Sequence, residues 1–139
     1  MAEKAFIDTN VLIYAHDQDA RKKQLRAAEW IRELWDSGMG RLSTQVLGEF
    51  YVTVTRKLRR PLSRSVAREV VRNYGLWVES AITPPTVIRA SEIGEIWQIS
   101  FWDSMILAAA EQDGAEILLT EDLSHHQIIA GIRIVNPFA

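Results

Sequence analysis

The sequence contains no cysteine and only four prolines among its 139 residues. The absence of cysteine excludes a disulfide framework, a thiolate nucleophile and any zinc, haem or iron–sulfur site that needs a cysteine ligand. The composition, 47% hydrophobic and 24% charged, is typical of a globular protein. At this length we expect residues 1–139 to form a single domain.

Long apolar runs and a strong net charge are also missing. No stretch approaches the roughly 18 consecutive apolar residues of a membrane-spanning helix, so we expect a cytoplasmic protein without membrane contact. The formal net charge of −2 argues against a protein that coats nucleic acid non-specifically. It leaves open an enzyme that acts on nucleic acid, because an acidic pocket can offset basic surfaces in the sum.

Several common catalytic motifs are absent as well. The seven glycines are scattered and form neither a G-x-G-x-x-G nor a G-K-[ST] loop, which disfavours a nucleotide-cofactor enzyme. There is no G-x-S-x-G elbow of a serine hydrolase. The three histidines, His16, His125 and His126, match no zinc-binding spacing, and we predict that they lie at the surface.

The apolar pattern predicts short strands that alternate with helices. The predicted strands are 4–7, 41–43, 77–82, 116–120 and 132–135, and the predicted helices are 11–14, 20–37, 44–58 (with Thr44 as its cap), 63–76, 86–97 and 100–111. This order is typical of an α/β protein with a mainly parallel sheet covered by helices on both faces. In such sheets the functional crevice lies at the carboxyl ends of the strands.

Four carboxylates occupy positions where burial or a sheet edge is expected. Asp8 and Asp122 follow predicted strands, Asp103 begins an apolar helix, and Glu49 lies among apolar helix neighbours. An ionised carboxylate that is buried without a partner costs several kcal/mol, and few lysines or arginines are near in sequence. Mg²⁺ or Mn²⁺ is the economical partner, because these hard cations prefer oxygen ligands.

Each of these carboxylates also has a simpler interpretation. Asp8 can cap the following helix, Asp103 is spaced from Ser100 as in a capping box, Glu49 can be a half-exposed helix residue, and Asp122 can lie in a solvated turn. The convergence of all four on one edge of the sheet favours a shared site. Asn10 and Thr120 are the polar neighbours expected to orient Asp8 and Asp122.

Two other classes of protein remain to be weighed. One is a non-catalytic α/β module that serves dimerisation or another interaction, with helix caps in place of catalytic acids. The other is a phosphotransfer receiver, which also gathers acids at strand ends but needs a lysine at the end of a late strand. No lysine follows Lys57, which argues strongly against the receiver.

Four segments together resemble the acidic motifs of PIN-domain ribonucleases, in the same order along the chain. They are Phe6-Ile7-Asp8-Thr9-Asn10, Val46-Leu47-Gly48-Glu49-Phe50, Trp102-Asp103-Ser104 and Leu119-Thr120-Glu121-Asp122-Leu123. Within that family the chain most resembles VapC-type toxins. The resemblance implies a three-layer α/β/α sandwich, endonucleolytic RNA cleavage that depends on Mg²⁺ or Mn²⁺, a homodimer and inhibition by a cognate antitoxin. At the position of His126 the family pattern leads us to expect glycine.

The resemblance also suggests roles for the four acids in metal-assisted hydrolysis of RNA. Asp8 and Asp103 are the expected principal metal ligands, and Asp122 is expected to act on the metal or on its water shell. Glu49 would hold or deprotonate the attacking water.

Contacts to RNA phosphates need cations, and seven of the sixteen lysines and arginines lie between positions 56 and 72. Arg64, Arg68 and Arg72 recur every four residues on one helix face, and we take Arg64 and Arg68 as candidate RNA contacts. The alternative is a solvated face that Glu69 partly neutralises. The five tryptophans mostly fall on apolar faces, so we expect them to pack in the core or in a dimer rather than to stack on bases.

Overall fold

A computed structural model describes residues 3–139 and contains a five-stranded sheet of order β2-β1-β3-β5-β4. The strands are β1 (Ala5–Ile7), β2 (Gly40–Arg41), β3 (Ile117–Leu119), β4 (Ile128–Ile129) and β5 (Ile132–Val135). All neighbouring strands pair in parallel except β4 and β5, which are antiparallel. The predicted α/β class with a mainly parallel sheet is confirmed.

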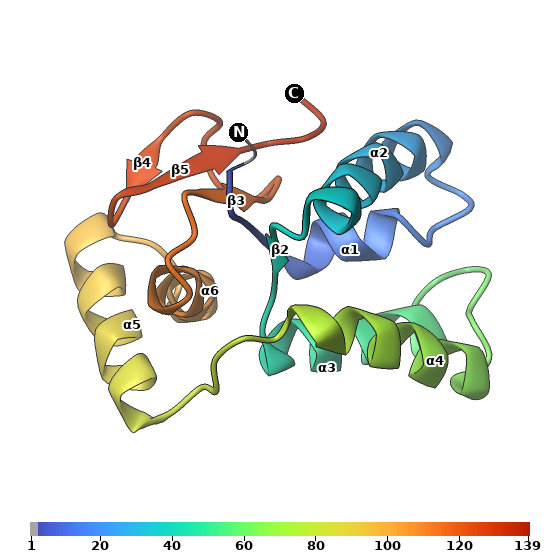
Figure 1. Cartoon of the computed structure of the whole chain (residues 1–139), viewed down its shortest axis with the longest axis horizontal. Coiled ribbons are helices and arrows are strands. Elements are labelled where there is room, and N and C mark those ends of the chain that lie inside the picture. The colour runs from blue at the N-terminus through green and yellow to red at the C-terminus, as the bar shows by residue number, and fades with distance from the viewer. Residues whose placement is uncertain (1–2) are drawn as a thin grey trace.

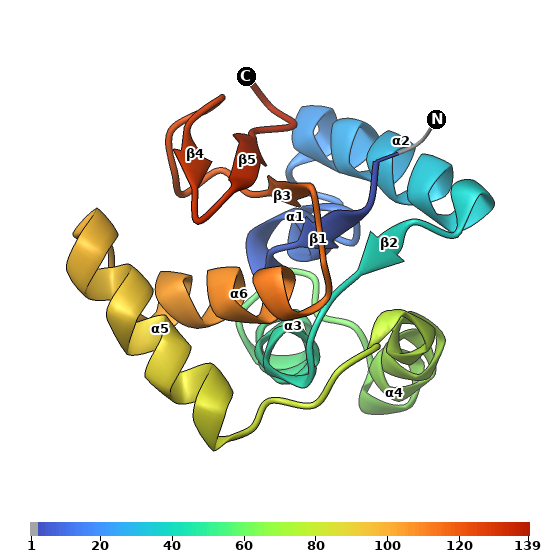
Figure 2. The same ribbon diagram turned by 60° about the vertical axis from the view of Figure 1, so that its left-hand side comes forward.

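The helices are α1 (Thr9–Tyr14), α2 (Arg21–Ser37), α3 (Thr44–Arg56), α4 (Arg64–Tyr74), α5 (Pro84–Trp97) and α6 (Phe101–Gln112), with a short 3₁₀ helix η1 (Gly75–Trp77) after α4. Figures 1 and 2 show α2 on one side of the sheet and α6 on the other, with α5 packed outside α6. Helix α6 is buried from Ser104 to Ala110, which explains its almost continuous apolar sequence. Within residues 3–139, every helix is too short or too polar to span a bilayer.

The central strands β1 and β3 bring distant parts of the chain together. Their residues are all buried, and Ile7 pairs with Leu119 at the carboxyl ends of the two strands. The next residue on each strand is polar, Asp8 after β1 and Thr120 after β3. The parallel register therefore places these two side chains beside each other at the edge of the sheet.

Two local predictions were wrong. The cap of α3 is Ser43, whose hydroxyl accepts from the amide of Val46, so the helix is capped one residue before Thr44. The predicted strand 77–82 is not formed: its first residue closes η1, and only Val78 makes an isolated bridge, to Leu42. The segment is held instead by a side chain, because the hydroxyl of Ser80 donates to Asp113 Oδ1 at 2.6 Å.

The hairpin between β4 and β5 was not predicted. Strand β4 has two residues, of which Ile128 is exposed, so it is too short to show an alternating pattern. Its turn consists of Ala130 and Gly131, both with positive φ, which is the requirement of a tight hairpin but lacks the usual Asn-Gly sequence. His126, at the position where glycine was expected, has a φ of 71° and thus adopts the left-handed conformation that favours glycine.

The contact between Gly40 and Trp77 leads to a prediction about stability. A Cβ atom on Gly40 would lie 2.7–2.9 Å from three atoms of the Trp77 ring, whereas a Cβ on Gly48 would meet nothing within 4 Å. Gly40→Ala should lower the free energy of unfolding by about 1–3 kcal/mol through overpacking. Gly48→Ala, in the interior of α3, should raise it by about 0.5–1 kcal/mol. Denaturant unfolding of both variants checks this, and equal stabilities would contradict the close packing at Gly40.

Candidate metal centre

Asp8 is a buried carboxylate held at the junction of β1 and α1. It caps α1 and has only 7% of its surface exposed. Its Oδ1 accepts from the amide of Thr9 at 2.7 Å, and its Oδ2 accepts from the hydroxyl of Thr120 at 2.8 Å. The capping role weighed from the sequence is therefore real, but it uses one oxygen and does not account for the burial of the whole carboxylate.

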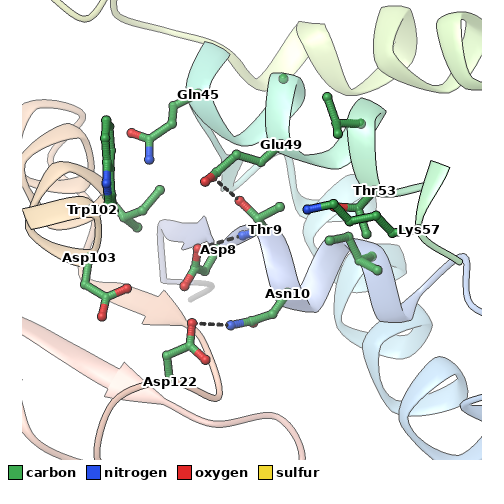
Figure 3. Close-up of a pocket in the computed structure, with 14 residues that line it drawn as sticks. Asp8, Thr9, Asn10, Gln45, Glu49, Thr53, Lys57, Trp102, Asp103 and Asp122 are labelled. Atoms are coloured by element: carbon green, nitrogen blue, oxygen red, sulfur yellow. Dashed lines mark hydrogen bonds between the residues drawn. The ribbon is translucent and has the colours of Figure 1, made fainter. Parts of the chain in front are cut away.

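Asp103 and Asp122 join Asp8 in a compact cluster. One carboxylate oxygen from each of the three lies within 4.8 Å of the others. The three come from different places in the fold: the end of β1, the first turn of α6 and the loop after β3. Figure 3 shows their carboxylates converging on the same space. The sequence-based prediction that these three acids meet at one edge of the sheet agrees with this geometry.

Asn10 and Thr120 link the cluster by hydrogen bonds. The amide group of Asn10 donates to Asp122 Oδ2 at 2.9 Å, as Figure 3 shows, and more weakly to the Thr120 hydroxyl at 3.4 Å. The Thr120 hydroxyl also accepts from the backbone amide of Asp122 at 3.1 Å. The two side chains thus fix the positions of Asp8 and Asp122 relative to each other, as expected from their places in the sequence.

The environment raises the pKa of two of the three carboxyls. Burial raises the pKa of Asp8 from 3.8 to about 6, and the negative charges of Asp122 and Asp103 add to this against the opposing bonds from Thr120 and Thr9. The pKa of Asp103 is raised by burial and by the charge of Asp122. A positive charge bound next to these carboxyls would favour their ionised form and so offset the rise in pKa.

The residues present fit a divalent cation. The donor set consists of hard oxygen atoms, which Mg²⁺ and Mn²⁺ prefer. Within the described part of the chain, the buried Oδ1 of Asn10 accepts no hydrogen bond, although its amide nitrogen is bonded. Such an oxygen is suited to a hydrogen bond from the water shell of a cation. The cluster is therefore a candidate metal centre formed by Asp8, Asp103 and Asp122.

Glu49 lies at the same pocket but outside the three-carboxylate cluster. Its side chain is exposed, so the burial argument made from its apolar neighbours does not apply to it. The hydroxyl of Thr9 donates to Glu49 Oε1 at 2.8 Å, which ties this carboxylate to the residue next to Asp8 (Figure 3). Glu49 is thus positioned at the rim, close to the cluster but not part of it.

One stripe of α3 forms a wall of the pocket, whose volume is about 560 Å³. Gln45, Glu49, Thr53 and Lys57 are spaced by four residues, so they share a helix face, and all four line the pocket. Figure 3 shows the side chain of Lys57 extending toward Thr9. From the sequence, Lys57 was counted only as part of the basic run at 56–72 and Gln45 was not considered, although both lie at four-residue intervals along the helix face of Glu49.

Other predicted residues lie away from this pocket. Arg64 and Arg68 are exposed on α4, and neither lines it. His125 and His126 are exposed as predicted. His16 is not a surface residue: it is half-buried, packs against the Phe50 ring, and its Nε2 lies 2.9 Å from the Tyr74 hydroxyl. The error arose because the position of His16 relative to α3 and α4 is set by tertiary packing.

The tryptophans divide between the interior and the surface. Trp77 is buried at 6% exposure and Trp30 packs against the core, in line with the prediction. Trp102 is 64% exposed and lines the acidic pocket, so it does not belong to the core.

The family model described as the PIN domain matches residues 5–130 of the chain. The chain belongs to the PIN-domain family. The resemblance drawn from the four acidic segments is therefore confirmed, and the sheet with its flanking helices is a PIN-like fold. A comparison of this PIN-domain chain with curated protein sequences gives no match.

Solved structures with the same PIN-like fold include toxins of toxin–antitoxin systems. A chain of a toxin–antitoxin complex from Klebsiella pneumoniae is 18% identical, with a TM-score of 0.68 over 96% of this chain and 97% of that one. VapC20 of Mycobacterium tuberculosis, described as a sarcin–ricin loop cleaving toxin, is 21% identical, with a TM-score of 0.61 over 93% and 98%. FitAcB of Neisseria gonorrhoeae is 17% identical, with a TM-score of 0.59 over 96% and 98%. At these identities the similarity establishes the fold.

The raised pKa of Asp8 predicts how stability varies with pH in metal-free buffer. Because the folded-state pKa is about 6 against an ordinary 3.8, the wild type should lose stability as pH rises between these values. Asp8→Asn carries no such charge and should exceed the wild type by about 1–3 kcal/mol at pH 7, with the two converging near pH 4.

Unfolding measured with chelator at both pH values checks this. Asp36→Asn, an exposed position on α2, is the matched control and should follow the wild type. A wild type more stable than Asp8→Asn at pH 7 would contradict the electrostatic account of the cluster.

Proposed function

We propose that this PIN-domain protein is a divalent-metal-dependent endoribonuclease that hydrolyses RNA phosphodiester bonds and acts as the toxin of a toxin–antitoxin pair. The observation that carries the proposal is the convergence of Asp8, Asp103 and Asp122 within 4.8 Å at the end of the central strands. The alternative, a non-catalytic interaction module with degenerate acids, does not require three carboxylates in mutual contact range with a raised pKa on the buried one.

In the proposed reaction Asp8 and Asp103 would hold the cation, Mg²⁺ or Mn²⁺, and Asp122 would support it directly or through water. When bound, the cation polarises the scissile phosphate and lowers the pKa of the attacking water. Asn10 and Thr120 keep Asp8 and Asp122 in place through the hydrogen bonds between them. Their role is to position the ligands, since neither requires contact with the substrate.

Glu49 is the proposed general base for the attacking water. It is exposed at the rim of the pocket, where water can reach it. The hydroxyl of Thr9 donates to one of its oxygens and leaves the other oxygen available. Lys57, the C-cap of α3, is the proposed contact for an RNA phosphate, because it is the cationic side chain that lines the pocket.

The proposed partners follow from the family and from the structural neighbours. The Klebsiella protein with the same fold was solved as a toxin–antitoxin complex. VapBC2 of Rickettsia felis, with a TM-score of 0.59, was solved bound to a fragment of promoter DNA. We therefore propose that this chain also binds an antitoxin and forms a homodimer.

Loss of a metal ligand should abolish cleavage. We expect Asp8→Asn and Asp103→Asn to reduce Mg²⁺- or Mn²⁺-dependent RNA cleavage by more than about 100-fold, since even outer-shell partners of metal sites are worth 10- to 100-fold. The measurement is the rate of cleavage of a labelled RNA by purified variants whose fold is verified by circular dichroism. Asp36→Asn is the control and should cleave like the wild type. Equal activity in all four proteins would defeat the assignment.

The position of Lys57 predicts how RNA binding responds to salt. Removing one phosphate contact should weaken binding to all RNA sequences and reduce the slope of log K against log salt by about 1. We expect this from Lys57→Ala and not from Lys22→Ala, an exposed lysine on α2. Arg64→Ala and Arg68→Ala test the predicted contacts on α4 in the same titration. A reduced slope in those two variants alone would place the RNA on α4 instead of at the pocket rim.

A further inference from the structure

Trp102 is a large aromatic side chain left open at the candidate metal centre. It directly precedes Asp103 in the first turn of α6, lines the pocket, and has 64% of its surface exposed. Leaving an indole ring in water forgoes most of the stabilisation that its burial would give. An exposed ring at the rim of a polar pocket is therefore a candidate binding surface.

Gln45 provides a second, independent feature of the same pocket. Its side-chain nitrogen and oxygen are both screened from solvent, and among the described residues neither has a hydrogen-bond partner. An amide left without partners in this way typically costs about 1–3 kcal/mol for each unmatched group. Figure 3 shows Gln45 and Trp102 at the same end of the pocket, where α3 and α6 begin. A ligand that carries a donor and an acceptor side by side would satisfy the Gln45 amide.

We infer that Trp102 and Gln45 form a nucleobase site, in which an unpaired base next to the scissile phosphodiester stacks on the Trp102 ring and hydrogen-bonds the Gln45 amide. The inference rests on the proposed ribonuclease activity and specifies its substrate. Stacking on aromatic rings combined with hydrogen bonds to base edges is how proteins recognise single-stranded RNA. A glutamine amide matches a base edge that offers one donor and one acceptor.

The exposed state of Trp102 makes this site accessible. Most of the Trp102 surface is open to solvent, and its one aromatic neighbour among residues 3–139 is the Phe101 ring, edge to face with a centroid distance of 5.2 Å. A base can therefore stack on the open part of the indole, and the proposal requires the screened Gln45 amide to turn toward that base. From Gln45 the stripe of α3 continues through Glu49 and Thr53 to Lys57, about 18 Å at 1.5 Å per residue. An RNA strand laid along this stripe has a base at the Gln45 end, the acids in the middle and a phosphate at the Lys57 end.

This arrangement selects RNA by its secondary structure. A base inside a duplex is stacked on both sides and paired at its edge, so neither Trp102 nor Gln45 can engage it. The substrate class is thus RNA with an unpaired base beside the cleaved bond, in a loop or a single strand.

The test compares the wild type with Trp102→Ala, Trp102→Phe and Trp97→Ala on one single-stranded RNA. Stacking is present in both ground and transition states, so its loss should raise KM and leave kcat nearly unchanged. We expect Trp102→Ala to raise KM about 5- to 150-fold, the equivalent of 1–3 kcal/mol, and Trp102→Phe to recover most of the loss. Trp97, the last residue of α5, is the matched control, because it is an exposed tryptophan that does not line the pocket.

Gln45→Glu replaces the amide donor by an acceptor and tests recognition of the base edge. Sequencing the ends of fragments from a random RNA pool should show a changed base preference at one position beside the cleavage site. Either a KM for Trp102→Ala equal to that of Trp97→Ala, or an unchanged preference in Gln45→Glu, overturns the nucleobase site. Failure of the wild type to cleave any RNA is a different result, because it overturns the proposed function itself.

Discussion

Repulsion among three carboxylates, one of them withdrawn from water, is the constraint on which the rest of this structure depends. Asp8 is fixed by the amide of Thr9 and the hydroxyl of Thr120, and these two bonds do not offset the loss of hydration, since its pKa remains raised to about 6. A bound cation would compensate for this cost. The hydrogen bonding of Asp122 supports this view. Its carboxylate accepts from the neutral amide of Asn10, which holds it toward the cluster, and not from a lysine or arginine of the described chain.

The sheet and the cluster were predictable because both follow from local rules. A polar residue directly after a run of buried residues marks the carboxyl end of a strand. The carboxyl ends of parallel strands lie at the same edge of the sheet, so Asp8 and Thr120 are neighbours. Asp103 was identified because it begins a strongly apolar helix, where its carboxylate was expected beside buried residues. The strand expected at 77–82 failed because pairing depends on a neighbour, and side-chain contacts of Ser80 and Trp77 hold that segment instead.

The rim of the site was much less predictable. Tertiary packing decides which apolar faces of the helices are covered and which stay exposed. The sequence therefore predicted packing for Trp102, whereas its side chain is exposed. The basic residues of α4 formed the more regular pattern, yet the lysine that lines the pocket is Lys57, at the C-cap of α3. At His126, in contrast, the family resemblance was informative. It led us to expect glycine, and the backbone of His126 has the left-handed conformation that glycine favours.

The central claim, that the cluster exists to hold a dication, is tested most directly by calorimetric titration of the wild-type protein with Mn²⁺ at pH 6 in two buffers of different ionisation enthalpy. Because the pKa of Asp8 is about 6, a share of the molecules is protonated at this carboxyl before binding. The account predicts saturable Mn²⁺ uptake accompanied by proton release, which disappears in Asp8→Asn. Absence of Mn²⁺ uptake, or uptake that Asp8→Asn leaves unchanged, would contradict it.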